Sequence, residues 1–234
     1  MSTSYTHARR RRPVRGQFRY GAVLVLLLVL LMFAIVAPDT DWAHAVDPAL
    51  AGSALAVAVA TSKAKGETRR LRALGVSAVA LLGVLGVGTG LFGVDLSFAV
   101  TTVLLAAVPV SLVGGLLRLI GHRGVTGQAV AGALAVYLSI GLLFAAVITF
   151  VGAIESGPYF KQTADAAGGI PVYYSFTVLT TTGFGDYTAA QPVGHALAVL
   201  EMLTGQLYLV TVIGLLVGNF ATRRMRNDPP AGTA

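Results

Sequence analysis

Long apolar runs, each close to the thickness of a lipid bilayer, dominate this 234-residue sequence. A helix needs about 20 apolar residues to cross the hydrocarbon core, and about 17 is the lower limit. A weak run covers residues 49–62 and extends back to Asp47. The stronger runs cover residues 21–37, 73–92, 96–117, 128–154 and 193–220. The pattern predicts an all-α membrane protein with six transmembrane helices.

The composition supports this fold class and excludes several kinds of chemistry. Hydrophobic residues make up 55% of the chain and charged residues 12%, whereas a soluble domain has about 25% charged residues. Cysteine is absent, which excludes disulfides, thiolate metal sites and cysteine nucleophiles. The four histidines have no metal-binding spacing, and no Ser/His or Asp/Asp pair lies within the predicted spans. We therefore expect no enzyme activity and no cofactor.

The net charge of +7 would suggest a nucleic-acid partner on a soluble protein, but the positions of the charges indicate membrane topology. With the N-terminus inside, all Lys and Arg residues except Lys161 fall in the inner segments, which are residues 1–20, 63–72, 118–127 and 221–234. Inner loops of membrane proteins are enriched in these residues. We therefore expect a multi-pass cell-membrane protein with both termini in the cytoplasm and no nucleic-acid partner.

Two of the six spans leave an alternative open. A basic segment before the apolar run at residues 21–37 is also typical of a signal peptide, although an uncleaved first span is favoured. The run at residues 49–62 could instead form a re-entrant or surface helix. The charge alternation favours a crossing there, because without it the cluster at residues 63–72 would lie outside.

A segment that lipid alone would not tolerate lies between the fifth and sixth runs. Residues 152–170 are polar and Gly-rich, and a short amphipathic stretch begins at Pro171. Proline is favoured in the first helical turn, and a helix of about ten to twelve residues is too short to cross a bilayer. The sequence Thr-Thr-Thr-Gly-Phe-Gly-Asp follows directly at residues 180–186. Irregular backbone at membrane depth is tolerated where it lines an aqueous pathway.

The residues from Thr181 to Asp186 resemble the potassium-channel family, whose selectivity filter reads T-[VIT]-G-[YF]-G-D between a pore helix and a pore-lining helix. The resemblance covers residues 128–222. It implies a re-entrant pore helix and a potassium-selective filter between the fifth and sixth spans. Potassium ions, the permeant ligand, would bind at Thr181, Thr182, Gly183 and Phe184, and the filter would continue through Gly185.

Physical chemistry adds two requirements to this resemblance. The filter carbonyls can all point to one side only if alternate residues adopt left-handed backbone conformations, which Gly183 and Gly185 do without a Cβ penalty. One chain supplies one strand of carbonyls, so several chains must surround an ion. Because the chain contains a single filter motif, we expect a homotetramer with cyclic symmetry.

The resemblance also assigns supporting residues. Asp186 at the outer mouth would form a hydrogen bond behind the filter with a pore-helix aromatic, which we assign to Tyr174. Thr177 stands where some family members carry a carboxylate behind the filter. Phe184 replaces a commoner tyrosine and lacks its hydroxyl. Gly205 lies where related channels have a gating-hinge glycine, and close packing is the alternative.

Glu201 is the one acid within the predicted spans. A charge at that depth is costly and faces a protein or aqueous interior, so Glu201 either braces the pore helix or is protonated and structural.

The resemblance divides the chain into a basic N-terminus (residues 1–20), a four-span domain (21–127), a pore domain (128–222) and a short tail (223–234). The fourth run lacks the regularly spaced arginines of a voltage sensor, so we expect little gating charge. The arginines of residues 1–20 could bind anionic lipids. The rival functions are a non-selective monovalent cation channel and, from another class, a secondary transporter. We find no inverted repeat or paired broken helices that would favour a transporter.

Overall fold

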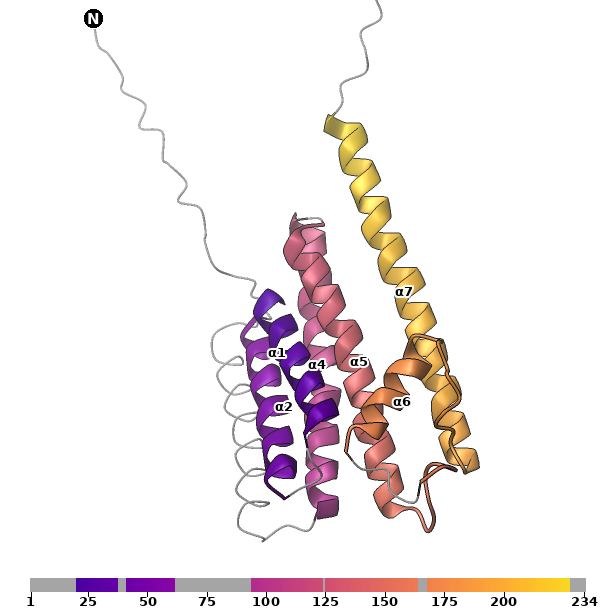
Figure 1. The fold of residues 1–234 in the computed structure, drawn as a ribbon. Coiled ribbons are helices and arrows are strands. Elements are labelled where there is room, and N and C mark those ends of the chain that lie inside the picture. Colours follow the sequence, from indigo (N-terminus) through magenta and orange to yellow (C-terminus); the bar gives the residue numbers. More distant parts are fainter. Residues whose placement is uncertain (1–19, 38–40, 62–93, 124, 164–167, 228–234) are drawn as a thin grey trace, which may run out of the picture.

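The computed structural model describes residues 20–37, 41–61, 94–123, 125–163 and 168–227. Within these ranges the fold is all-helical, apart from an isolated antiparallel bridge between Phe160 and Ala189. The helices are α1 (Tyr20–Val36), α2 (Asp41–Thr61), α4 (Val94–Arg123), α5 (Gly127–Ile154), α6 (Ile170–Leu179) and α7 (Pro192–Asn227) (Figure 1).

The helices correspond to the predicted elements, but several are longer than the apolar runs. α2 begins at Asp41 rather than at residue 47 or 49, α4 continues to Arg123, and α7 continues to Asn227. Polar residues that flank an apolar run can extend a helix, and hydropathy does not mark such an end. The predicted third span, residues 73–92, lies outside the described residues, as do most of the basic N-terminus and the end of the tail.

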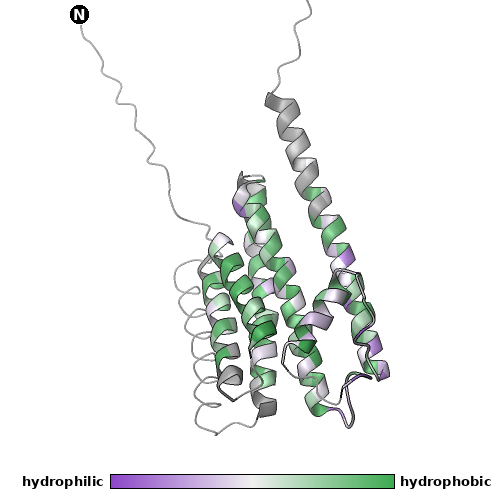
Figure 2. Ribbon diagram, in the orientation of Figure 1, coloured by the Kyte–Doolittle hydropathy of each residue, from purple (hydrophilic) through white to green (hydrophobic). Residues whose placement is uncertain are grey.

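Three helical segments of the described chain are long and apolar enough to cross a membrane: Phe98–Leu117, Gly127–Ile154 and Pro192–Val212. α5 has 28 residues. Because an α-helix rises 1.5 Å per residue, α5 is about 42 Å long and exceeds the hydrocarbon core of about 30 Å. α1 and the apolar part of α2, Ala49–Val59, are shorter. Apolar residues predominate along the coloured parts of the helices (Figure 2).

The described helices run in alternating directions. The start of α1 lies beside the early part of α5, where the Gly21 amide donates to Gln128 Oε1 at 3.4 Å, so these two helices are parallel. α4 is antiparallel to α5, because the Thr102 hydroxyl near its start lies 3.3 Å from the carbonyl oxygen of Ala146 near the end of α5. α7 is also antiparallel to α5 (Figure 1). These directions agree with those expected for the first, fourth, fifth and sixth spans.

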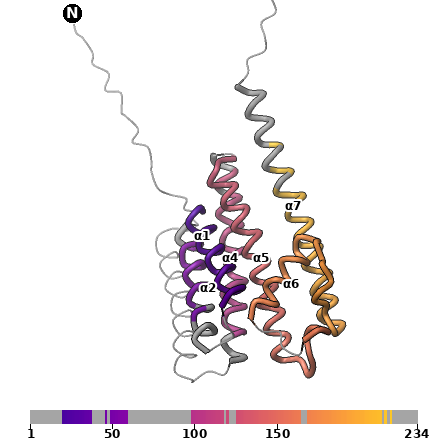
Figure 3. Tube along the Cα trace, viewed as in Figure 1, coloured from indigo at the N-terminus to yellow at the C-terminus, as the bar shows by residue number. Residues whose placement is uncertain are grey.

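Two groups of buried side chains hold the helices together. The larger core joins α1, α2, α4 and α5 and includes the fully buried Leu27, Leu55, Leu112 and Val136. The smaller cluster surrounds α6 and comprises Ile148, Tyr159, Phe160, Tyr174, Val178 and Ala189. The second cluster positions α6 between α5 and α7, an arrangement that the Cα trace shows directly (Figure 3).

The C-terminal end of α1 contacts the start of α6 through backbone atoms. Gly169 caps the N-terminus of α6, and a Cβ atom built on it would lie 2.5 Å from the carbonyl oxygen of Ile35. No side chain fits at this distance without movement of one helix. The close approach of α1 to α6 therefore depends on glycine at position 169.

We expect the substitution Gly169→Ala to separate α1 from α6 and to destabilise the protein by about 1–3 kcal/mol, as overpacking of a core does. Thermal unfolding of the purified protein in detergent measures this effect. Gly127→Ala is the matched control, because a Cβ atom at Gly127 meets nothing within 4 Å. Equal midpoints for the two variants would contradict the prediction.

Candidate functional site

The short helix α6 positions the segment that carries the candidate motif. α6 has ten residues, with Pro171 in its first turn. It is about 15 Å long, too short to cross a bilayer. Its C-terminal cap is Thr180, whose amide donates to the carbonyl of Phe176 at 3.1 Å. The sequence prediction of a short helix that ends before the motif is confirmed, and the helix begins at Ile170, one residue before the predicted Pro171.

The backbone of the motif alternates in handedness. Thr181, Gly183 and Gly185 have φ angles of 58°, 50° and 80°. The prediction of left-handed conformations at both glycines is confirmed. The sequence did not indicate the left-handed conformation of Thr181, because a positive φ is rare for a β-branched residue and costs about 1–3 kcal/mol.

Hydrogen bonds from the motif to the last turn of α6 hold this backbone in place. The amides of Thr182 and Gly183 both donate to the carbonyl of Thr177, at 2.8 and 3.0 Å. The amide of Thr181 donates to the carbonyl of Val178 at 2.9 Å. Thr177 therefore contacts the motif through its backbone carbonyl, while its hydroxyl donates within α6 to the carbonyl of Tyr174.

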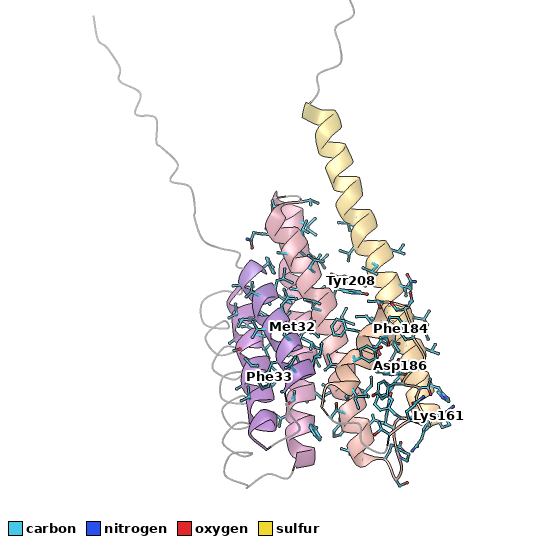
Figure 4. The ribbon with its side chains drawn as sticks, in the orientation of Figure 1. Met32, Phe33, Lys161, Phe184, Asp186 and Tyr208 are labelled. Atoms are coloured by element: carbon cyan, nitrogen blue, oxygen red, sulfur yellow. The ribbon has the colours of Figure 1, made fainter. Side chains whose placement is uncertain are left out.

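Residues Thr180 to Asp186 are all exposed on the single chain. The side chain of Phe184 is 69% exposed, and its ring stacks on that of Tyr173 with an interplanar angle of 6°. Figure 4 shows Phe184 and Asp186 on the α7 side of the molecule, across α5 from Met32 and Phe33 of α1. The motif is thus supported from behind by α6 and open on its other side.

Asp186 bonds to Tyr173 and not to Tyr174, so that part of the sequence prediction is wrong. The phenol of Tyr173 donates to Asp186 Oδ2 at 2.8 Å, and this bond is the main cause that raises the pKa of Tyr173 above its ordinary value. Adjacent residues of an α-helix point about 100° apart, since one turn takes 3.6 residues. Tyr174 therefore faces inward, where its ring packs edge-on against the ring of Phe160, with the two ring centroids 5.1 Å apart.

A small backbone tie connects the loop before α6 to the loop after the motif. The amide of Lys161 donates to the carbonyl of Thr188 at 3.0 Å, and the amide of Ala190 donates to the carbonyl of Tyr159 at 2.8 Å. The Gln162 side chain adds two bonds to Thr188, each 3.0 Å long. Sequence reasoning missed this tie, because no motif marks it and its two backbone bonds join residues that are 27 and 31 positions apart.

Glu201 and Gly205 lie one turn apart on the face of α7 that is turned toward α6. Glu201 is completely buried, and its Oε1 lies 2.5 Å from the Ser175 hydroxyl of α6. Glu201 therefore contacts α6, the short helix that one of the two sequence interpretations expected it to brace. A Cβ atom on Gly205 would collide with the carbonyl oxygen of Leu179, so Gly205 serves close packing of α7 on α6. Its role as a hinge stays a prediction.

Two tyrosines connect the same region to α5. The Tyr208 hydroxyl of α7 donates to the Ala133 carbonyl at 2.7 Å, and the Tyr137 hydroxyl of α5 donates to the Leu179 carbonyl at 3.3 Å. The labelled Tyr208 lies above the motif between α5 and α7 in Figure 4. The C-terminal end of α6 is thus anchored to α5, and α7 is bonded to α5 as well.

Comparison with known proteins finds a family model that is similar to this part of the chain. The ion channel family model matches residues 136–222, which run from α5 through α6 to α7. No curated protein and no solved structure matches the chain. The family match supports an ion channel function. Together with the long apolar helices, it indicates a membrane protein.

We expect Tyr173→Phe to loosen the motif, because the substitution removes the hydrogen bond to Asp186 and keeps the ring that stacks on Phe184. Amide hydrogen exchange of residues 181–187 should accelerate roughly tenfold, the effect of losing about one hydrogen bond. Tyr187→Phe is the control, since its ring contacts with Phe160 and Tyr173 remain. Unchanged exchange in Tyr173→Phe would show that the bond does not hold the motif.

Proposed function

We propose that this chain is the subunit of a homotetrameric, potassium-selective channel that conducts passively through residues 181–185. The observation that carries the proposal is the alternation of left-handed conformations at Thr181, Gly183 and Gly185. Alternate left-handed residues turn successive carbonyls to the same side of a strand. This geometry suits a ring of oxygens that replaces the hydration shell of a potassium ion.

The position of α6 supports cation binding at the same place. Its C-terminal end, which carries the partial negative charge of the helix dipole, leads directly into Thr180 and the motif. Asp186 adds a carboxylate beyond the filter, on the side proposed as the outer mouth. The motif is therefore bordered by negative potential at both ends, as a cation pathway requires.

The exposure of the single chain supports assembly of four copies. All filter residues are exposed, and so are large apolar residues of α7, including Leu207 at 66% and Val210 at 71%. One strand of carbonyls cannot surround an ion. Cyclic assembly would bring four strands together and cover both surfaces.

The rest of the chain takes supporting roles in this proposal. Residues 128–222 form the pore domain, and residues 21–127 form a membrane domain that contacts it through α1 and α4 without sensing voltage. The channel lies in the cell membrane with both termini in the cytoplasm, and the arginines of residues 1–20 contact anionic lipids.

A non-selective monovalent cation channel is the nearest alternative. Phe184 argues against it, because an aromatic residue is retained at the position where the resemblance requires one. The ring of Phe184 stacks on that of Tyr173 of α6. No observation in the described residues favours a secondary transporter.

We expect Gly183→Ala to abolish potassium flux without preventing assembly. A left-handed conformation costs a non-glycine residue about 1–2 kcal/mol, and the penalty applies in each of four chains, so flux should fall by on the order of a hundredfold or more. Potassium flux from vesicles measures the loss, and the detergent-corrected mass should still equal four chains.

Gly114→Ala is the matched control for this substitution, because a Cβ atom at Gly114 on α4 meets nothing within 4 Å. Normal flux through Gly183→Ala would refute the filter assignment. A monomeric wild-type protein would refute the tetrameric pore.

A further inference from the structure

One hydroxyl group behind the filter contacts two acceptor oxygens at once. Ser175 Oγ lies 2.7 Å from the carbonyl oxygen of Gly141 on α5 and 2.5 Å from Oε1 of Glu201 on α7. Both distances are within the range of an O–H···O hydrogen bond. Ser175 and Glu201 are each completely buried, so water does not replace either contact.

A count of hydrogens decides which group donates in each contact. A serine hydroxyl has one hydrogen, and a backbone carbonyl has none. The short contact with Gly141 therefore uses the hydrogen of Ser175, because two oxygens at that distance repel each other without one. The contact between Ser175 and Glu201 then needs a second hydrogen, and the only remaining source is the carboxyl group of Glu201.

The surroundings of Glu201 favour the same assignment. Its second oxygen, Oε2, is buried and has no hydrogen-bond partner among the described residues. The ionisable side chains that interact with Glu201 are Tyr137 on α5, Tyr159 in the following loop and Tyr174 on α6. Tyrosines are uncharged at neutral pH. In the described part of the chain, no cationic side chain pairs with Glu201. A buried carboxylate without a cation would be strongly unfavourable.

We propose that Glu201 is a neutral carboxylic acid. Its O–H donates a hydrogen bond to the hydroxyl oxygen of Ser175, and the Ser175 hydroxyl donates a hydrogen bond to the carbonyl oxygen of Gly141. The resulting chain of two hydrogen bonds joins α7, α6 and α5 behind the filter. Ser175 lies two residues before Thr177, whose carbonyl receives the amides of Thr182 and Gly183. Glu201 is therefore a positioning residue that acts on the filter through α6. The protonation state of Glu201 does not depend on the proposed function. The effect of Glu201 on conduction does rest on the proposed function.

Infrared spectroscopy of the purified full-length protein tests the proton directly. Solvated carboxylic acids have a pKa near 4 and are ionised at about pH 7.5, so a protonated-carboxyl C=O band at that pH reports a buried acid. We expect this band in the wild type, its loss in Glu201→Gln, and its retention in Glu155→Gln. Glu155 is exposed at the C-terminus of α5 and serves as the control. Absence of the band from the wild type, or its persistence in Glu201→Gln, would overturn the proposal.

Potassium flux from vesicles tests the positioning role. A glutamine amide has the shape of a neutral acid and can donate to Ser175, whereas an alanine cannot. We expect Glu201→Gln to keep flux within about twofold of the wild type and Glu201→Ala to lower it roughly tenfold, as loss of a buried hydrogen-bond partner does. An equal loss of potassium flux in both variants would overturn the proposed chain of hydrogen bonds. If the wild type itself carries no potassium, the proposed function fails, and the infrared band still decides the state of Glu201.

Discussion

The candidate site depends on how a ten-residue helix, α6, is held in place between longer apolar helices. α6 is too short to cross a bilayer, so its backbone groups and those of the following segment need partners within the protein. The Thr177 carbonyl accepts two amides of the motif, and the Tyr137 hydroxyl bonds to the carbonyl of Leu179. These contacts fix the backbone of the motif, in which Thr181, Gly183 and Gly185 have left-handed conformations.

The contacts of α6 also link the two halves of the chain. α5 and α7 enclose it, α1 meets its N-cap residue, and a backbone tie joins the loop before α6 to the loop after the motif. Small residues allow two of these approaches, because Gly169 meets the backbone of Ile35 and Gly205 meets the backbone of Leu179. In a membrane, where apolar surface gains nothing by leaving lipid, close packing of this kind is a main source of helix association.

Sequence reasoning predicted the features that depend on local chemistry. The apolar runs predicted helices in every described span, the proline and length of the short stretch predicted α6, and the glycines predicted left-handed backbone at positions 183 and 185. It could not predict which of two adjacent tyrosines contacts Asp186, because the choice depends on the rotation of α6 against its neighbours. The positive φ of Thr181 and the bond between Glu201 and Ser175 likewise depend on tertiary contacts that no local pattern encodes.

Selectivity for potassium is the central claim of this account, and the reversal potential under bi-ionic conditions tests it most directly. The purified protein would be reconstituted in a planar bilayer, with potassium on one side and sodium on the other. Carbonyl oxygens arranged by the alternating backbone predict a reversal potential that is displaced far from zero toward the potassium equilibrium potential. A reversal potential near zero, which indicates equal permeability to both ions, would contradict the account.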